Sequence, residues 1–340
     1  MDRLKEIESI YLIRQFKKEQ VAVSFSGGKD SLVALSLAIK AGIKNIVFSD
    51  TTIEPDIVKH YINSVSDFFG IEIKILEPLR NFWELLPILG PPSVYNRWCC
   101  PTLKYYQLNK YALENNILYF VTGLRKKESN IRKNYIKIGV NPMMPRTKEI
   151  NPIIDWTEKE VWEYINKNSL PISDEYKIGL KRNGCIFCPY KSDKDLELMM
   201  SLEPQKWERF KEFLKEYALK NGIYNIEEFQ NGGWKRFRPP QKKIKIEDLS
   251  IIDYQSIYLS KIINEYTPRL KKKILIEKSL NCLGCGACLI SCPENALFIN
   301  HLNKIDVDIN KCKKCYNCTE STVIRKGCIS RNYSNQIFEI

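Results

Sequence analysis

The spacing of the cysteines near one end of the chain constrains the fold more than any other feature. Cys282, Cys285, Cys288 and Cys292 form a C-x-x-C-x-x-C-x-x-x-C run, which Pro293 follows directly. A second group begins 30 residues after the first and consists of Cys312, Cys315 and Cys318. Sulfurs this close in sequence hold their loop around a metal centre, so the repeat predicts a small domain that metal stabilises.

The cysteine run resembles that of the bacterial two-cluster ferredoxins, in which the fourth cysteine ligates the other cluster of the pair. This resemblance implies two 4Fe–4S clusters and electron transfer. The second copy departs from the pattern, because nine residues separate Cys318 from Cys328 where three are expected. We assign one cluster to Cys282, Cys285, Cys288 and Cys328, and the other to Cys312, Cys315, Cys318 and Cys292. The alternative is a pair of structural zinc sites, although zinc does not need three cysteines at successive two-residue steps.

A second region carries a glycine-rich loop between an expected strand, residues 21–25, and an expected helix, residues 32–41. The loop consists of Ser26, Gly27, Gly28, Lys29, Asp30 and Ser31. Glycines let a backbone approach a phosphate closely, and a helix N-terminus directs amide donors at the anion. The motif resembles the PP-loop of the adenine-nucleotide α-hydrolase superfamily and lacks the longer spacing of a Walker A loop. A plain strand-to-helix turn is the alternative.

Strands are also expected at residues 45–49, 71–76, 118–122, 149–154 and 296–299. In the first part of the chain they alternate with helical stretches, which predicts an α/β fold with a doubly wound parallel sheet. Ligands of such sheets bind beyond the carboxyl ends of the strands. Asp50 and Thr51 follow one expected strand, and Gly123 and Arg125 follow another, so we expect these residues at the nucleotide site.

Three segments together resemble the sulfonucleotide (PAPS/APS) reductases: DTTIEP at 50–55, TGLRKKESNIRKNY at 122–135 and INPIIDWTEKEVWEYI at 150–165. The resemblance covers roughly residues 20–190 and keeps the order of the family's motifs. It implies that Arg125 and Arg132 lie near the phosphate or sulfate groups of the substrate, with Gly123 and Glu128 in the same nucleotide site. Arginine suits this role through its planar, bidentate donors.

A third set of cysteines comprises the adjacent pair Cys99 and Cys100 and the distant C-x-x-C of Cys185 and Cys188. It resembles the cluster motif of the 4Fe–4S sulfonucleotide reductases, including Lys104 shortly after the pair. The resemblance implies a third 4Fe–4S cluster near the reactive end of the substrate. A zinc site is the alternative, because an isolated C-x-x-C is common in zinc sites.

The chain departs from the reductases in two ways. Their nucleophilic cysteine lies in a C-terminal E-C-G-x-H motif that this sequence lacks, and its twelve cysteines are all assigned to clusters. Its loop, SGGKDS, is the form found in superfamily members that cleave ATP between the α and β phosphates. A variant hypothesis makes Cys328 the nucleophile, activated by Lys326.

Three functions follow as hypotheses. The favoured one is reduction of PAPS or APS to sulfite and the adenosine phosphate, with electrons from the fused ferredoxin-like domain and an external low-potential donor. The alternative is an ATP-dependent sulfur transferase of the tRNA thiolation or DNA phosphorothioation type. Basic segments at 235–245 and 269–273, with Trp234 and Phe237 as stacking candidates, fit that alternative. Solvated surface charge on a lysine-rich protein is the explanation that we favour for these segments. The third is an electron-transfer or regulatory subunit without chemistry.

The remaining predictions concern organisation. Residues 1–190 are expected to form the nucleotide-binding domain, 191–275 a helical basic appendage and connector, and 276–340 the small α+β ferredoxin-like domain. Residues 1–20 read as an amphipathic helix with Leu4, Ile7, Ile10 and Tyr11 near one face. They lack a signal peptide's apolar core, which together with the many cysteines predicts a cytoplasmic protein without a membrane span. The formal charge of +13 would attract polyanions, although cluster thiolates reduce it. A homodimer is compatible with these features.

Overall fold

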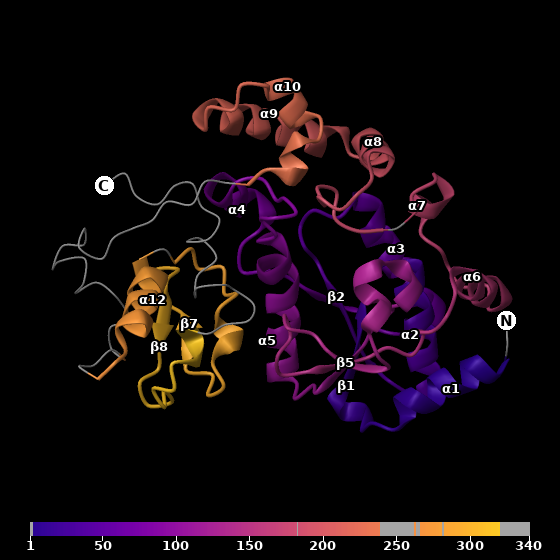
Figure 1. Ribbon diagram of the computed structural model, residues 1–340. Helices are drawn as coiled ribbons and strands as arrows, with labels where there is room; N and C mark the ends of the chain where they lie inside the picture. Colours follow the sequence, from indigo (N-terminus) through magenta and orange to yellow (C-terminus); the bar gives the residue numbers. More distant parts are fainter. Residues whose placement is uncertain (1–2, 182, 239–261, 263–265, 281, 320–340) are drawn as a thin grey trace. The chain divides into compact units, whose positions relative to one another are not determined.

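The structure, a computed structural model, describes residues 3–181, 183–238, 262, 266–280 and 282–319 (Figure 1). Its contacts divide the chain into two compact units. The first consists of Met1–Glu77, Gln107–Phe187 and Lys191–Pro204, and the second of Pro78–Tyr106, Cys188–Tyr190 and Gln205–Ile340. The domain boundaries at 190 and 275 follow the sequence alone and stay a prediction.

The first unit is built on a six-stranded sheet in the order β3-β2-β1-β4-β6-β5. Every neighbouring pair is parallel except β5 and β6, which are antiparallel, so the predicted doubly wound, mainly parallel sheet is confirmed. The order places β1 between β2 and β4, with Val23 opposite both Ile46 and Val121. The strands are β1 (Val21–Phe25), β2 (Asn45–Ser49), β3 (Lys74–Leu76), β4 (Tyr119–Val121), β5 (Ile138–Val140) and β6 (Lys148–Ile150).

Three of the strands expected in this unit were too long, and one strand of the unit was missed. The strand expected at 118–122 covers only Tyr119–Val121. The strand expected at 71–76 begins only at Lys74, and the one expected at 149–154 ends at Ile150. The sequence did not predict the strand β5, because its three residues include Gly139 and show no alternation of apolar and polar side chains. Its position depends on pairing with β6, a contact that local propensity does not encode.

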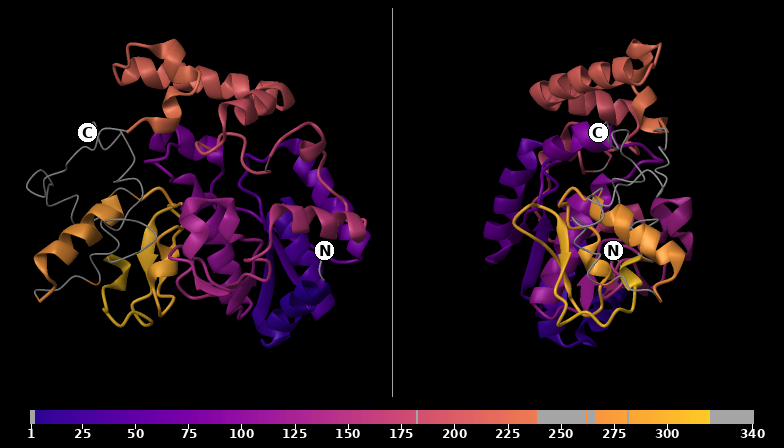
Figure 2. Two further views of the ribbon diagram at one scale, coloured as in Figure 1. Left: turned by 45° about the vertical axis from the view of Figure 1, so that its right-hand side comes forward. Right: turned by 90° about the vertical axis from the view of Figure 1, so that its left-hand side faces the viewer.

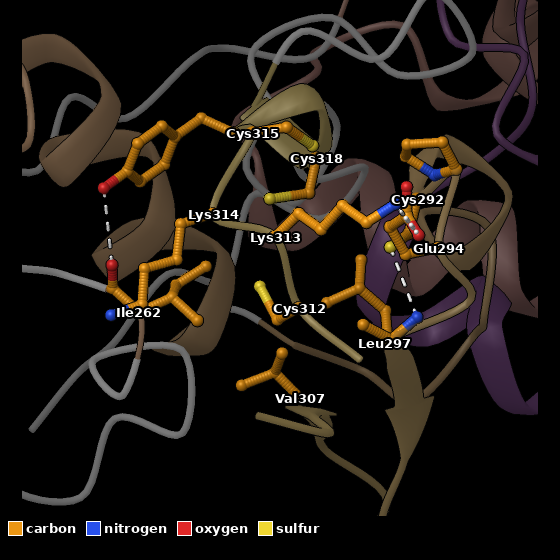
Figure 3. Close-up of a pocket in the computed structure, with 13 residues that line it drawn as sticks. Ile262, Cys292, Glu294, Leu297, Val307, Cys312, Lys313, Lys314, Cys315 and Cys318 are labelled. Carbon is orange, nitrogen blue, oxygen red and sulfur yellow. Dashed lines mark hydrogen bonds and ion pairs between the residues drawn. The ribbon is translucent and has the colours of Figure 1, made fainter. Parts of the chain in front are cut away.

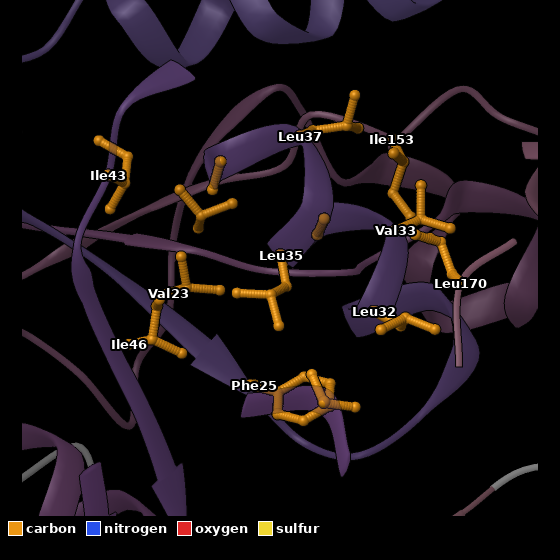
Figure 4. Packing of buried hydrophobic residues seen from close by; sticks show 14 of the residues in the cluster. Val23, Phe25, Leu32, Val33, Leu35, Leu37, Ile43, Ile46, Ile153 and Leu170 are labelled. Atoms are coloured by element: carbon orange, nitrogen blue, oxygen red, sulfur yellow. The ribbon is translucent and has the colours of Figure 1, made fainter. Parts of the chain in front are cut away.

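The hydrophobic core of this unit surrounds the helix that follows the glycine-rich loop. Helix α2 (Lys29–Ala41) buries side chains on almost every face, among them Leu32, Val33 and Leu35 (Figure 4). It packs against β1, α1 and α6, and it ends at Gly42 in the left-handed conformation (φ 91°). The other helices of the unit are α1 (Arg3–Arg14), α3 (Asp56–Phe69), α5 (Tyr106–Glu114), α6 (Glu158–Lys167), α7 (Asp174–Lys177) and α8 (Asp193–Leu202).

The predicted helix at the start of the chain is present as α1, but its expected apolar face is not the packed one. Leu4, Ile7 and Tyr11 are exposed. The helix instead buries Ser9 and Ile13, and the Ser9 hydroxyl donates a hydrogen bond of 2.6 Å to the Pro152 carbonyl. Of the four residues expected on the apolar face, only Ile10 packs against the core, partly buried, and Leu4, Ile7 and Tyr11 remain outside.

The second unit contains a cluster of aromatic side chains and the cysteine-rich domain. Its helices α9 (Pro204–Lys220) and α10 (Ile226–Gln230) lie close together in both views of Figure 2, and the expected helix break near Pro204 is confirmed. Trp234, expected as a base-stacking candidate, is fully buried and packs edge-on against Phe210, with ring centroids 5.1 Å apart. That expectation was wrong, because the ring serves the core. The unit also contains α4 (Phe82–Leu89).

In the cysteine-rich domain, β7 (Leu297–Ile299) and β8 (Ile305–Val307) form an antiparallel hairpin, which confirms the strand expected at 296–299. Helix α12 (Arg269–Leu280) lies along this hairpin and contacts β8 (Figures 1 and 2). Most of the connector expected at 246–275, and also Cys328, lies outside the described residues. The short turns of the two units are η1 (Lys18–Gln20), η2 (Cys100–Tyr105), η3 (Lys126–Glu128), η4 (Asn130–Asn134), η5 (Gly233–Arg236), η8 (Leu289–Ser291) and η9 (Asn317–Thr319).

Within the described parts of the chain, no helix combines the length and the apolar character that crossing a bilayer requires.

We predict that Gly123→Ala destabilises the protein by about 1–3 kcal/mol, the range for overpacking in a core. A Cβ at this position would lie 2.5 Å from both the carbonyl carbon of Asp30 and the amide nitrogen of Ser31, and backbone atoms in a buried helix cannot move aside. Gly139→Ala is the matched control, since its Cβ would meet the Asn151 side chain at 3.4 Å and the Ile136 carbonyl oxygen only at 3.9 Å. Urea unfolding measures both variants, and equal midpoints would contradict the prediction.

Candidate functional site

The glycine-rich loop closes on itself at the carboxyl end of β1. The Ser31 hydroxyl donates to the Gly28 carbonyl at 2.8 Å, and the hydroxyls of Ser26 and Ser31 lie 3.1 Å apart. Gly27 has a φ of 78°, a conformation that favours glycine. The loop therefore leads the chain sharply from strand to helix, and it leaves the first amides of α2 at the sheet edge where anions bind.

Two residues that the sequence prediction missed hold this loop. The Lys29 amide donates to the Tyr176 hydroxyl at 2.9 Å, and the Asn183 side chain donates to the Gly27 carbonyl at 2.8 Å. The Lys29 ammonium is 5% exposed, lies 5.7 Å from the Tyr176 ring centroid and pairs with Glu158 at 3.4 Å. Nothing in the local sequence marks Tyr176 or Asn183, because each reaches the loop only through the fold.

Arg125 joins the loop from the neighbouring strand. Its Nε donates to Asp30 at 2.5 Å, and the side chain is buried. Among the described residues the terminal guanidinium nitrogens show no further hydrogen bond or ion pair. Because β1 and β4 are neighbours whose connections run to opposite sides, Arg125 and Asp30 lie at a topological switch point of the sheet, where α/β proteins bind their ligands.

Glu128 and Arg132 follow in the turns η3 and η4 and form an ion pair with one another. Both side chains are partly exposed. The structure thus brings Gly123 and Arg125 directly against the loop, whereas the roles expected of Glu128 and Arg132 in nucleotide binding stay predictions.

Asp50 and Thr51 form a tight turn after β2, as expected for residues beyond the carboxyl end of a strand. The Thr52 amide donates to the Asp50 carboxylate at 2.7 Å, and Thr52 has a φ of 65°, which is unusual for a β-branched residue. The Thr51 hydroxyl lies 2.6 Å from a carboxyl oxygen of Glu54 and 3.3 Å from the sulfur of Cys185. The turn therefore links the predicted nucleotide site to one cysteine of the third set.

Glu54 is a titratable group of this turn that the sequence prediction missed. Burial raises the pKa of its carboxyl to about 7; the hydrogen bond from Thr51 opposes the rise, and the negative charge of Asp50 adds to it. A carboxyl that titrates near neutrality can hold or release a proton beside the turn.

The Cys99–Cys100 pair begins the turn η2, a π-helical segment of a kind often found at functional sites. Arg97 donates to the Cys100 sulfur at 3.4 Å and lies 4.9 Å from the Tyr190 ring centroid. The pKa of the Cys100 thiol is lowered, first by a hydrogen bond with Cys99 and then by the charges of Arg97 and Lys104, against the effect of burial. This cationic environment favours the thiolate, the form that binds metal.

Cys99, Cys100 and Cys188 belong to the second unit and Cys185 to the first, and each unit is described by itself. The surroundings of the pair favour a thiolate at Cys100. The fourfold set with Cys185 and Cys188 stays a prediction, as does the role of Lys104 at the nucleotide. All eleven cysteines in the described part of the chain are free thiols.

In the cysteine-rich domain, Cys292, Cys312, Cys315 and Cys318 line one pocket, in agreement with the predicted ligand set (Figure 3). The backbone amide of Ala296 donates to the Cys292 sulfur at 3.3 Å. No three metal-binding side chains in the described residues are arranged around a single ion. In a bound 4Fe–4S cluster each of these four cysteines would ligate a different iron.

The first cysteine set shows the same kind of support for its sulfurs. Cys282 accepts hydrogen bonds from the amides of Ile305 at 3.0 Å and Gly284 at 3.4 Å, and its side chain is buried. Amide donors of this kind stabilise ligating thiolates. Cys328, the proposed fourth ligand of this set, lies outside the described residues.

We predict that Glu54 makes the protein less stable as the pH rises from about 4.5 to about 7. The raised pKa keeps this carboxyl protonated in the folded state while the unfolded chain has already released the proton. In the wild type, this loss of unfolding free energy reaches roughly 1.4 kcal/mol for each pH unit of the window, and Glu54→Gln removes it. Urea unfolding across the window measures it, and exposed Glu114→Gln controls for the loss of one charge. Parallel profiles of wild type and Glu54→Gln would contradict the prediction.

Comparison with known proteins agrees with this geometry. Residues 20–191 match the model of the phosphoadenosine phosphosulfate reductase domain, and residues 273–321 match that of the 4Fe-4S dicluster domain. One uncharacterised protein of Methanocaldococcus jannaschii is 36% identical over 211 residues, which is 61% of this chain and 44% of that protein. A second uncharacterised protein of the same organism is 28% identical over 255 residues, which is 72% of this chain and 61% of that protein. The chain therefore spans about half the length of these curated relatives.

The adenosine 5'-phosphosulfate reductase of Bacillus cereus is 26% identical over 185 residues, 50% of this chain and 74% of that protein. Among solved structures, the PAPS reductase of Candida auris aligns with a TM-score of 0.44 and 19% identity, over 54% of this chain and 90% of that one. The U34-tRNA thiolase of Methanococcus maripaludis aligns with a TM-score of 0.37 and 18% identity, over 70% and 81%. The chain therefore belongs to the phosphoadenosine phosphosulfate reductase domain family and carries a 4Fe-4S dicluster domain after it.

Proposed function

We propose that this protein is an iron–sulfur sulfonucleotide reductase, which reduces PAPS or APS to sulfite and the adenosine phosphate. The observation that carries the proposal is Arg125, buried at the switch point beside the first turn of α2 and held there by Asp30. A guanidinium fixed through its Nε presents its other nitrogens as a planar pair of donors, which suits a phosphate or sulfate group.

The reaction balances with two electrons. The bond between the sulfate sulfur and the bridging oxygen breaks, the oxygen leaves with the adenosine phosphate, and the sulfur accepts the electron pair as sulfite. Bound clusters would supply these electrons one at a time from an external low-potential donor. The chain's own residues bind and orient the nucleotide: Ser26, Gly27, Gly28, Lys29, Asp30 and Ser31 with the first amides of α2, Asp50 and Thr51 after β2, and Arg125 at the anionic groups.

Two further parts of the proposal concern the cysteines. Three 4Fe–4S clusters would use all twelve cysteines, with the third bound by Cys99, Cys100, Cys185 and Cys188. The cationic surroundings of Cys100 support a ligating thiolate there. In the variant of the mechanism, Cys328 acts as nucleophile instead. A Cys328→Ser protein that keeps both dicluster-domain clusters but loses turnover supports the variant, and one that loses a cluster removes it.

The second candidate is an ATP-dependent sulfur transferase of the tRNA thiolation or DNA phosphorothioation type. The observation that favours it is the complete loop, in which Ser26, Gly28 and Ser31 close the turn and Lys29 stays within reach of Glu158. A loop that accepts the β and γ phosphates of ATP would release pyrophosphate when it adenylates an acceptor. The buried Trp234 removes one of the two stacking residues expected for a nucleic-acid partner.

Anaerobic oxidation of reduced viologen by the reconstituted protein decides between the two candidates. PAPS, APS and ATP are added in parallel. Oxidation with PAPS or APS, accompanied by sulfite in a ratio of two viologens to one sulfite, is the expected result. Absence of oxidation with either, together with AMP and pyrophosphate from ATP, would overturn the reductase and direct the search to a thiolated acceptor, with tRNA first.

We further predict that Arg125→Lys lowers kcat/KM for the sulfonucleotide by about ten- to a hundredfold, or roughly 1.4–2.7 kcal/mol of transition-state stabilisation. Lysine keeps the charge near Asp30 but lacks the planar pair of donors. The iron content should not change. The neighbouring Lys126→Ala is the matched control, because Lys126 forms an exposed ion pair with Asp155, at 2.7 Å, of a kind that contributes little. Unchanged turnover in Arg125→Lys would remove Arg125 from the site.

A further inference from the structure

A buried lysine lies against one of the two cysteine sets of the dicluster domain. Lys278, on helix α12, is only 1% exposed. Its ammonium donates to the carbonyl oxygen of Cys318 at 2.5 Å, and in the described part of the chain this carbonyl is the one hydrogen-bond partner found for it. Helix α12 packs against β8 and against η9, the turn that contains Cys318. The contacts of α12 with β8 and with η9 therefore hold Lys278 beside Cys318.

An ammonium group withdrawn from water needs a negative charge nearby, because burying it alone costs several kcal/mol. No carboxylate pairs with Lys278 among the described residues. The anionic groups at hand are the sulfurs that line the pocket. Burial raises the pKa of the Cys318 thiol, and the charge of Lys278 lowers it, so the lysine and this sulfur interact electrostatically.

The other lysines of the domain that contact this region differ from Lys278 in exposure or in partner. Lys313 has a side chain that is 72% exposed and is paired with Glu294 at 2.9 Å, as the dashed line in Figure 3 shows. Water and the carboxylate screen its charge. Lys304 donates to the Cys282 carbonyl at 2.7 Å, in the other cysteine set, but is only partly buried. Each set thus has a lysine on a cysteine carbonyl, and the one at Cys318 is fully withdrawn from water.

We propose that Lys278 is an electrostatic tuning residue, whose buried charge raises the reduction potential of the cluster bound by Cys292, Cys312, Cys315 and Cys318. Reduction adds one electron to an already anionic cluster, so a fixed cation beside it stabilises the reduced form more than the oxidised form. Lys304 acts on the cluster of the first set in the same direction and more weakly. The cluster beside Lys278 is then the one on which an electron entering the domain comes to rest.

The test is a potentiometric titration of the reconstituted full-length protein, followed by EPR. In Lys278→Gln the amide can still donate a hydrogen bond but the charge is lost, whereas Lys278→Arg keeps the charge. We expect Lys278→Gln and Lys278→Met to lower one midpoint, so that the ratio of reduced to oxidised cluster at a fixed potential falls at least tenfold, which is 59 mV for one electron. Lys278→Arg should stay within threefold of the wild type. Lys304→Met, the matched control, should shift a different midpoint by a smaller factor.

Three results would overturn the proposal. In the first, both neutral variants keep their full iron content, and their ratios of reduced to oxidised cluster at a fixed potential stay within threefold of the wild type. The second is a shift in Lys278→Arg as large as that in Lys278→Gln, which would assign the effect to packing. The third is loss of one cluster's iron from both neutral variants, which would make the lysine structural. These measurements need no substrate, so their outcome is separate from that of the proposed reaction.

Discussion

The close approach of one glycine to a helix is the contact on which the nucleotide site depends. The backbone of Gly123, just after β4, lies so near the first turn of α2 that a Cβ there would be 2.5 Å from backbone atoms of Asp30 and Ser31. This contact is what allows Arg125, two residues later, to reach Asp30 and to be buried beside the loop. The remaining polar contacts of the loop come from Tyr176 and Asn183, which lie much further along the chain than Gly123 and Arg125.

Cations placed beside sulfur are the second recurring feature. The charges of Arg97 and Lys104 lower the pKa of the Cys100 thiol, whereas burial raises the pKa of the Cys318 thiol and the charge of Lys278 only opposes that rise. In a chain with a formal charge of +13, part of the basic excess therefore serves the cysteines rather than an external polyanion. The same logic applies at the loop, where Lys29 and Arg125 are buried next to carboxylates, an arrangement that a phosphate or sulfate group can join.

Local sequence patterns were sufficient wherever the structure is set by neighbouring residues. The strands β1 and β2 have the predicted bounds, the helix break lies near Pro204, and the short strand after the first cysteine run is present. The predictions that were wrong concern packing between distant segments. Leu4, Ile7 and Tyr11 of α1 are exposed, and Trp234 is buried, because which side of a helix or turn is covered depends on what the fold brings against it.

The sequence by itself determined the family, the parallel sheet, the loop and the cysteine spacings, because each is a pattern of residues close together in the chain. Only the tertiary structure decided which groups meet: Arg125 with Asp30, Tyr176 with the Lys29 amide, Glu54 with Thr51, and Lys278 with Cys318. Thr51 and Glu54 are three residues apart in the sequence, whereas Lys29 and Tyr176 are 147 residues apart. Their meeting, and the burial that shifts the pKa of Glu54, follow from strand order and helix packing, which no local pattern encodes.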